Sequence, residues 1–299
     1  MPLTWDFDAL EILNGKRMEL IRTPTQPELD AFGRGEDVTV YEMQTRTLAE
    51  QQELSDGLYR LGYGYEGQVD DWFTLLNLGY RFTAIGNSDT HGTTSVESGC
   101  PRNFVMSDIE QPAFLDDQTI ADAIKAHRVV ASYGPFVEMW VNGEPIGGET
   151  NSDGGEIDIE VRVQAPSWID VQRVELYENG TLIHEWDVPE TGEVLRLDEV
   201  YTVAPEKDSW YVIIVSGDDD LAPVFTPVEV PYVELQVVVE EALSEIGAVA
   251  DFLSPTIPIP REYPVHPFAL TNPVWVDVDG GGFDAPGLPD WLQEPIEPE

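Results

Sequence analysis

The chain has 299 residues, of which 42% are hydrophobic and 10% aromatic, so it can build folded cores and global disorder is excluded. Fifteen Lys and Arg against 57 Asp and Glu give a formal net charge of −42 at pH 7. Such a charge repels phosphate backbones and anionic lipid, so we expect no nucleic acid or membrane-surface partner. Because salt screens the self-repulsion, we interpret the charge as a sign of a saline or extracellular habitat; the alternative is an acidic surface with no ecological meaning.

The single cysteine, Cys100, excludes an intrachain disulfide framework. No run approaches the ~20 apolar residues that a membrane helix needs, so we predict no membrane span. The first 15 residues lack the basic and apolar segments of a signal peptide, and a strand pattern begins almost at once. We therefore expect the chain to start inside a domain, and we favour an extracellular or periplasmic location for the full-length protein.

The first 150 residues show α/β character. We predict strands over residues 9–13, 81–86, 103–107 and 129–133, and helices over 47–61, over 69–78, and from a cap at Asp116 or Asp117 onward. The segment 22–38 carries Pro24, Pro27 and Gly33 and is predicted to be a surface excursion. Alternating strands and helices are typical of parallel α/β units.

The pattern changes at residues 151–155 (NSDGG), which we interpret as a linker. Apolar and charged residues then alternate strictly over 157–163, the pattern of a half-buried strand. Further strands are predicted over 171–177, 182–188, 194–203 and 210–216, so residues 151–230 should form an Ig-like antiparallel β-sandwich. The remainder, 231–299, is predicted to hold a helix over 233–253 and an extended, proline-rich segment over 255–267.

Chemistry is indicated by Asp89 and His91, in a loop that follows a predicted strand. Two residues apart in an extended segment, a carboxylate and an imidazole lie on one side of the backbone. They can bind one divalent ion, or two adjacent ions, of the Zn, Mn or Fe kind. The alternative is that Asp89 only caps a turn and His91 is an ordinary loop residue.

Seven short segments follow one another along the chain: residues 7–14 (FDALEILN), 71–79 (DWFTLLNLG), 86–92 (GNSDTHG), 99–102 (GCPR), 124–130 (IKAHRVV), 133–136 (YGPF) and 271–280 (TNPVWVDVDG). In this order they resemble the PHP (polymerase and histidinol phosphatase) superfamily, with its carbaryl-hydrolase-like (CehA/McbA) branch the nearest. Each piece is short, but the ordered set covers nearly the whole chain.

The resemblance implies a distorted (β/α)7 barrel with divalent Zn, Mn or Fe ions at the carboxyl ends of its strands. A metal-bound hydroxide would hydrolyse a small phosphoester, carboxylic ester or carbamate ester. Asp89 and His91 match the family's last metal-ligand motif. Glu11 and Asn14 match a strand that borders the site, where they would support the ligands without binding metal. Arg102 would contact an anionic substrate, or else form a surface ion pair.

The chain departs from the family in lacking a counterpart of its His-x-His motif and its further His and Glu/Asp ligands. The other three histidines, His127, His184 and His266, are predicted to be structural or solvated. We therefore expect the chain to be the C-terminal part of a PHP barrel. By the resemblance it belongs to a metal-dependent hydrolase, but alone it should be inactive. The N-terminal half of the barrel is then a candidate partner. The alternative is a non-catalytic binding or interaction protein built on the sandwich with a degenerate barrel remnant.

Two other kinds of site are weaker. Residues 277–284 (DVDGGGFD) resemble a calcium loop, but Leu288 stands where an EF-hand needs its bidentate glutamate. Neither Cys100 nor any serine has a base partner nearby in the sequence, so nucleophilic catalysis is unsupported.

Overall fold

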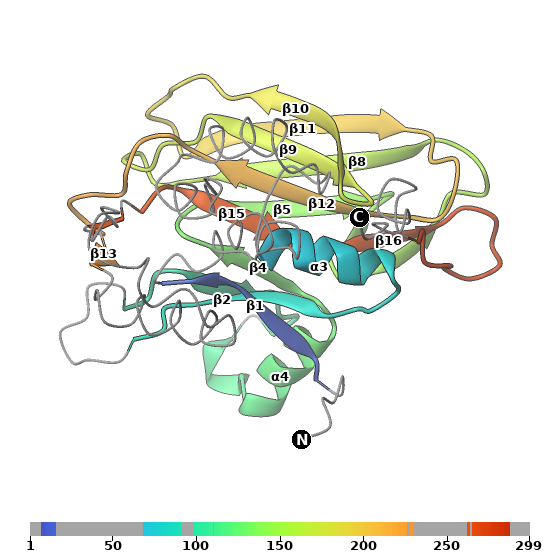
Figure 1. The fold of residues 1–299 in the computed structure, drawn as a ribbon, viewed down its shortest axis with the longest axis horizontal. Coiled ribbons are helices and arrows are strands. Elements are labelled where there is room, and N and C mark those ends of the chain that lie inside the picture. The colour runs from blue at the N-terminus through green and yellow to red at the C-terminus, as the bar shows by residue number, and fades with distance from the viewer. Residues whose placement is uncertain are drawn as a thin grey trace, which may run out of the picture.

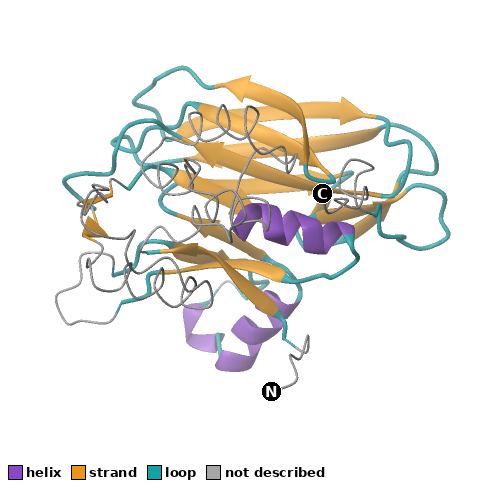
Figure 2. Cartoon of the chain, in the orientation of Figure 1, coloured by secondary structure: helices purple, strands orange, loops and turns teal. Residues whose placement is uncertain are grey.

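The structure, a computed structural model, describes residues 7–15, 68–90, 98–109, 111–225, 228–229, 262–263 and 265–287. In these ranges the chain is mostly β, with several sheets and two α-helices (Figures 1 and 2). The helices predicted over 47–61 and 233–253, the surface excursion over 22–38 and most of the proline-rich segment lie outside the described residues. Within the described part of the chain, no helix is both long and apolar enough to cross a membrane.

The larger sheet joins strands from distant parts of the sequence. Its strands, in spatial order, are β10 (Thr181–Asp187), β9 (Arg173–Glu178), β12 (Ser209–Ser216), β15 (Phe268–Thr271), β4 (Val129–Ser132) and β3 (Arg102–Val105). Neighbours in this series are antiparallel. β16 (Val274–Asp277) also pairs with β12 and, in parallel, with β7 (Glu149–Asn151).

A four-stranded antiparallel sheet faces the larger one. Its order is β11 (Leu195–Val203), β8 (Ile157–Gln164), β5 (Phe136–Val141) and β6 (Glu144–Pro145). Burial along β8 alternates, because one side of this sheet packs inward and the other meets solvent. Two further short strands, β13 (Val228–Glu229) and β14 (Glu262–Tyr263), pair with each other.

The central strand β12 is buried along its whole length, because both faces of the larger sheet are covered. On the face away from the four-stranded sheet lies α3 (Gln68–Asn77), whose Phe73 ring packs 5.6 Å from that of Tyr177 and 5.0 Å from that of Trp210 (Figure 1). Trp210 Nε1 also donates to Asn77 Oδ1 at 2.8 Å. This double coverage explains why β12 is a continuous apolar run rather than an alternating one.

The strands β1 (Ala9–Asn14) and β2 (Thr83–Asn87) form a separate parallel pair. Two asparagine side chains join β2 to the larger sheet. Asn272 accepts from Ala84 N (2.8 Å) and donates to Ala84 O (2.9 Å) and Val129 O (2.8 Å). Asn103 exchanges two hydrogen bonds with the backbone of Gly86. These amides take the place of the backbone ladder that β2 does not form with the sheet.

The second α-helix, α4 (Asp117–Lys125), begins where the sequence predicts. Asp116 is its N-cap and accepts from Thr119 N at 2.8 Å. A 3-10 turn, η3 (Pro112–Phe114), precedes it. The helix ends just before His127, which adopts a left-handed φ of +58°.

Most predicted strands in the described ranges are present, but the parallel rhythm predicted for the first 150 residues is only partly correct. β1 and β2 are parallel, whereas β3 and β4 pair antiparallel and lie in the same sheet as the sandwich strands. The segment predicted to be a linker is tied down, since Ser152 N donates to Asp277 O at 3.0 Å and Gly154 N to Val278 O at 2.8 Å. Strand pairing crosses both predicted divisions, since β7 at residue 150 pairs with β16 and β12 pairs with β15 beyond residue 230. The division of the chain into domains at residues 150 and 230 stays a prediction.

Candidate functional site

The candidate site lies at the carboxyl ends of the parallel strands β1 and β2. Gly15 N donates to Asn87 O at 2.9 Å, which extends the pairing by one residue beyond β1. A Cβ on Gly15 would stand 2.1 Å from Ser88 O, so only glycine allows the two strand ends to approach this closely. The parallel arrangement brings residues 14–15 and 87–88 together at one edge.

A carboxylate and two amides form a network at this edge. Glu11 Oε1 accepts from Asn14 Nδ2 at 2.6 Å, and Glu11 Oε2 accepts from Asn87 Nδ2 at 2.7 Å. In a regular strand, residues 11 and 14 would point to opposite faces. A register shift between Glu11 and Leu13 re-aims the strand end, so that both side chains meet on one face.

The end of β1 is also bonded to a residue that follows a strand of the larger sheet. Tyr133, which follows β4 and is 1% exposed, donates from its hydroxyl to Asn14 O at 2.5 Å. Its own backbone N donates to Phe268 O at 2.7 Å. Tyr133 and Asn87 were noted in the sequence only as parts of motifs, and their contacts to residues 11 and 14 carry no local sequence signal.

Asp89 follows β2 by two residues and is half-buried, with φ at +50°. Hydroxyls surround its turn: Ser88 Oγ lies 2.9 Å from Thr90 Oγ1, which lies 3.2 Å from Ser98 Oγ. His91, the second predicted ligand, lies outside the described residues. Among the residues that are described, no three His, Cys, Asp or Glu side chains gather in a group that could hold a metal ion.

The chain was compared with family models, curated proteins and solved structures. None of them matches it. The family resemblance therefore rests on the motifs quoted above.

Arg102, the predicted anion contact, starts β3 and is exposed. Its guanidinium lies 5.6 Å from the centroid of the Phe225 ring, a cation–π arrangement. The predicted role in anion binding stays a prediction.

His127 is half-buried after α4, with its ring 5.1 Å from that of Trp275 in an edge-on contact. Thr83 Oγ1 donates to Ile124 O at 2.7 Å, so the His127 Nδ1 at 2.8 Å must be the donor to this hydroxyl. Burial, and then the positive charge of Arg81, lower the pKa of His127 to about 4, although Asp8 acts in the opposite direction. The ring is therefore neutral at pH 7, and its contacts fit the structural role predicted for His127.

His184 on β10 likewise packs between rings. It stacks on Tyr201 of β11 at 4.3 Å and meets Trp186 edge-on at 4.4 Å. The contact with Tyr201 joins edge strand β10 of the larger sheet to edge strand β11 of the four-stranded sheet. It supports the structural role predicted for His184.

The segment that resembles a calcium loop uses its carboxylates for its own turns. Asp277 accepts from Gly280 N at 2.7 Å and from Gly282 N at 2.8 Å. Asp208 accepts from Val278 N at 2.8 Å and from Asp284 N at 2.7 Å. These backbone contacts give Asp277 and Asp208 a role in shaping the turns of this segment.

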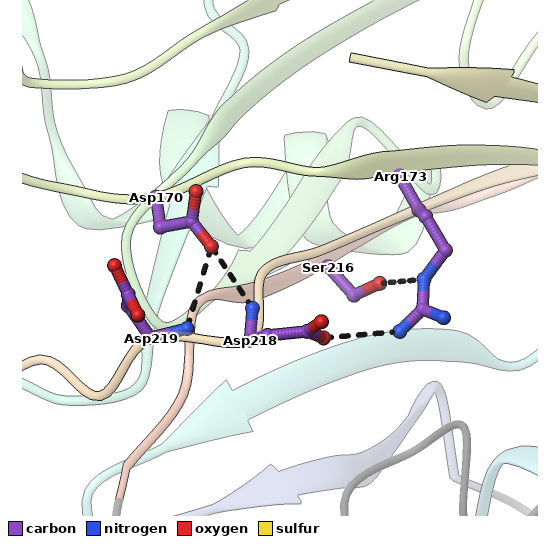
Figure 3. Close-up of polar contacts among 5 residues, drawn as sticks. All are labelled: Asp170, Arg173, Ser216, Asp218 and Asp219. Carbon is purple, nitrogen blue, oxygen red and sulfur yellow. Dashed lines mark hydrogen bonds and ion pairs between the residues drawn. The ribbon is translucent and has the colours of Figure 1, made fainter. Parts of the chain in front are cut away.

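The acidic turn after β12 is organised in the same way (Figure 3). Asp170 Oδ2 accepts from the backbone N of Asp218 at 3.0 Å and of Asp219 at 3.3 Å. Arg173 donates to Ser216 Oγ at 3.5 Å and to Asp218 Oδ1 at 3.3 Å.

Proposed function

We propose that this chain is the C-terminal portion of a PHP-type metal-dependent hydrolase, with its metal site at the carboxyl edge of β1 and β2. The observation that carries the proposal is the parallel pairing of these strands. It brings Glu11 into contact with Asn87, which precedes Asp89, the first residue of the predicted Asp-x-His ligand motif, by two positions. In open α/β sheets and barrels, active sites lie at the carboxyl ends of parallel strands.

The donor chemistry fits a divalent ion. Asp89 and His91 would hold it, because a carboxylate and an imidazole suit Zn, Mn and Fe. Glu11 is proposed to support the ligand loop rather than to bind the ion, since each of its oxygens accepts an amide hydrogen bond. Such an ion, when bound, lowers the pKa of a coordinated water and polarises the substrate.

The chain's own residues would orient and shield this chemistry. Glu11 would fix the side-chain amides of Asn14 and Asn87, and the Tyr133 hydroxyl would fix the backbone carbonyl of Asn14. The net charge of −42 disfavours polyanionic substrates. A small phosphoester, carboxylic ester or carbamate ester is therefore the proposed substrate class, with Arg102 the proposed contact for an anionic group.

The test is hydrolysis of an aryl ester and a generic phosphodiester by the chain alone and by a fusion to a PHP N-terminal barrel half. We expect the chain alone to bind Zn²⁺ or Mn²⁺ weakly and to be inactive, because Asp89 and His91 are two ligands where a catalytic zinc site has three. The fusion should gain activity and lose it in Asp89→Ala and in His91→Ala. Activity that survives both substitutions would refute the assignment of this loop.

A second candidate is a non-catalytic binding protein built on the two facing sheets. The observation that favours it is that β3 and β4 lie in the same sheet as the sandwich strands. A sheet built in this way needs no barrel to complete it. The DNA upstream of the Met1 codon separates the two candidates. A reading frame that encodes His-x-His and the other ligands supports the hydrolase, and a frame without them supports the binding protein.

A further inference from the structure

The chain contains three Asn-Gly steps, at residues 14–15, 142–143 and 179–180. An asparagine at such a step can lose ammonia, because the following glycine has no side chain to hinder attack by its backbone nitrogen on the asparagine side-chain carbon. The structure describes all three steps and places them in different surroundings. These surroundings decide which step can react in the folded chain.

The step at residues 14–15 is held at both reacting groups. Gly15 N, the nitrogen that would attack, donates to Asn87 O at 2.9 Å. Asn14 Nδ2 donates to Glu11 Oε1 at 2.6 Å, and Asn14 is only 7% exposed. Reaction here therefore requires the end of β1 to separate from β2.

The other two steps form hairpin turns of the same geometry. Asn142 (φ +49°) and Gly143 (φ +79°) join β5 to β6, and Asn179 (φ +53°) and Gly180 (φ +82°) join β9 to β10. Two successive left-handed residues are typical of a type I′ turn. Neither glycine nitrogen donates a hydrogen bond to any residue that the structure describes. The attacking atom is therefore unoccupied in both turns.

Each of these asparagines is bonded to a neighbouring strand in the same way. Asn142 N donates to Asp158 O at 2.8 Å and its Oδ1 accepts from Asp158 N at 2.9 Å. Asn179 N donates to Trp210 O and its Oδ1 accepts from Trp210 N, both at 3.0 Å. Asn179 has one bond more, since its Nδ2 donates to Ser209 Oγ at 2.9 Å. Within the described ranges, the Nδ2 of Asn142 has no such acceptor.

The two turns also differ in how readily they can open. Closure of the five-membered ring needs rotation about the asparagine backbone, so a turn must open locally before it reacts. Asn142 and Gly143 are exposed, and β6 beyond them has only two residues. Gly180 is buried, and the strands on either side of its turn have six and seven residues. Opening at residues 142–143 therefore breaks fewer contacts.

We propose that Asn142 is a site of spontaneous deamidation in the folded chain, which converts it to aspartate or isoaspartate. Gly143 N forms a bond to Asn142 Cγ, the Cγ–Nδ2 bond breaks, and ammonia leaves with the proton that Gly143 N gives up. Water then opens the resulting succinimide at one of its two carbonyls, and no other reactant is needed. Either product carries one more negative charge, and isoaspartate also lengthens the main chain between β5 and β6 by one carbon.

The test follows all three steps in the full chain, folded and in urea, during incubation in mildly alkaline buffer. Mass spectrometry of proteolytic peptides measures the conversion of each asparagine. In urea the three steps should react at similar rates. In the folded chain Asn142 should react at least about tenfold faster than Asn179, because Asn179 must also give up the hydrogen bond to Ser209 and expose a buried glycine. Asn14 should be slower than Asn142 by a similar factor or more.

Ser209→Ala is the matched variant, because it removes the acceptor of Asn179 Nδ2 and leaves the turn at residues 142–143 unaltered. It should speed the reaction of Asn179 several-fold and leave that of Asn142 unchanged. Asn14 reports on the whole fold, since its reaction speeds up as well if the variant unfolds. Equal rates at Asn142 and Asn179 in the folded unaltered chain, or faster reaction at Asn179 or Asn14, would overturn the proposal. Asn142 that stays intact in the folded chain while all three steps convert in urea would overturn it too.

Discussion

At the residue scale, His127 is a histidine whose protonation is determined by its burial in the fold. Its ring packs on Trp275 and its Nδ1 donates to Thr83, while burial and Arg81 lower its pKa to about 4. An unfolded chain would bind a proton at this side chain near pH 6.5. Between these two values the unfolded state binds more protons, so the folded state loses stability as the pH falls.

We therefore predict that His127 contributes to an acid-sensitive free energy of unfolding. From pH 7 to pH 4 the unaltered chain should lose about 2 kcal/mol more than His127→Asn, a value reduced for the partial exposure of the ring. Asparagine tolerates the left-handed φ of +58° and can still donate to Thr83. Urea unfolding at several pH values measures the difference, and parallel curves for the two proteins would contradict the prediction.

The candidate site also shows what single residues do not reveal. Asp89, His91, Glu11 and Asn14 were predicted from their place in motifs, but the contact of Glu11 with Asn87 depends on a strand pairing 76 residues apart. Tyr133 reaches Asn14 across 119 residues. The bulge that lets residues 11 and 14 share a face has no signature in the run ALEILN.

At the element scale, the buried Asn272 amide is the main polar link between β2 and the larger sheet. It is 0% exposed and satisfies Ala84 N, Ala84 O and Val129 O. Its side-chain NH₂ serves two carbonyls at once, so an aspartate of the same shape would bury an unpaired carboxylate oxygen against them. Ala84 O would lose this donor, and Val129 O would keep only the backbone N of Asn272 at 3.2 Å.

We predict that Asn272→Asp lowers the free energy of unfolding by about 3 kcal/mol or more, since each unsatisfied buried group costs about 1–3 kcal/mol. The matched control is Asn103→Asp. Asn103 is half-buried and bonds only to Gly86, so its loss should be smaller. Chemical denaturation of the three proteins tests this, and equal losses for the two variants would show that Asn272 has no special role.

Elements with a strong local pattern were predicted well. β8 alternates because only one of its faces is buried, and α4 begins at its Asp116 cap. β5 was missed: a strand was predicted over 129–133 and none directly after it, but the chain turns at Gly134-Pro135 and enters the second sheet at once. β15 and β16 were missed as strands because their partners are far away, as in the pairing of Leu270 with Ala131.

At the scale of the whole molecule, the net charge of −42 opposes compactness. The ion pairs of the described residues lie at the surface, such as that of Arg81 with Glu149 at 2.8 Å, and contribute little each. Salt screens the repulsion over a Debye length of about 10 Å at 0.1 M.

We predict that the melting temperature rises from dilute buffer to molar NaCl. KCl at the same ionic strength should give a similar rise if screening is the cause. Calorimetry or circular dichroism measures the transition, and a flat or falling melting temperature would remove the interpretation of a saline habitat while leaving the fold unaffected.

The central claim is that a divalent ion binds at the carboxyl edge of β1 and β2. Its most direct test is an anomalous-scattering map from crystals of the chain soaked in Mn²⁺ or Zn²⁺. We predict a peak about 2.0–2.2 Å from an Asp89 carboxylate oxygen and a His91 ring nitrogen. A map whose peaks lie only elsewhere, with none at this loop, would contradict the account.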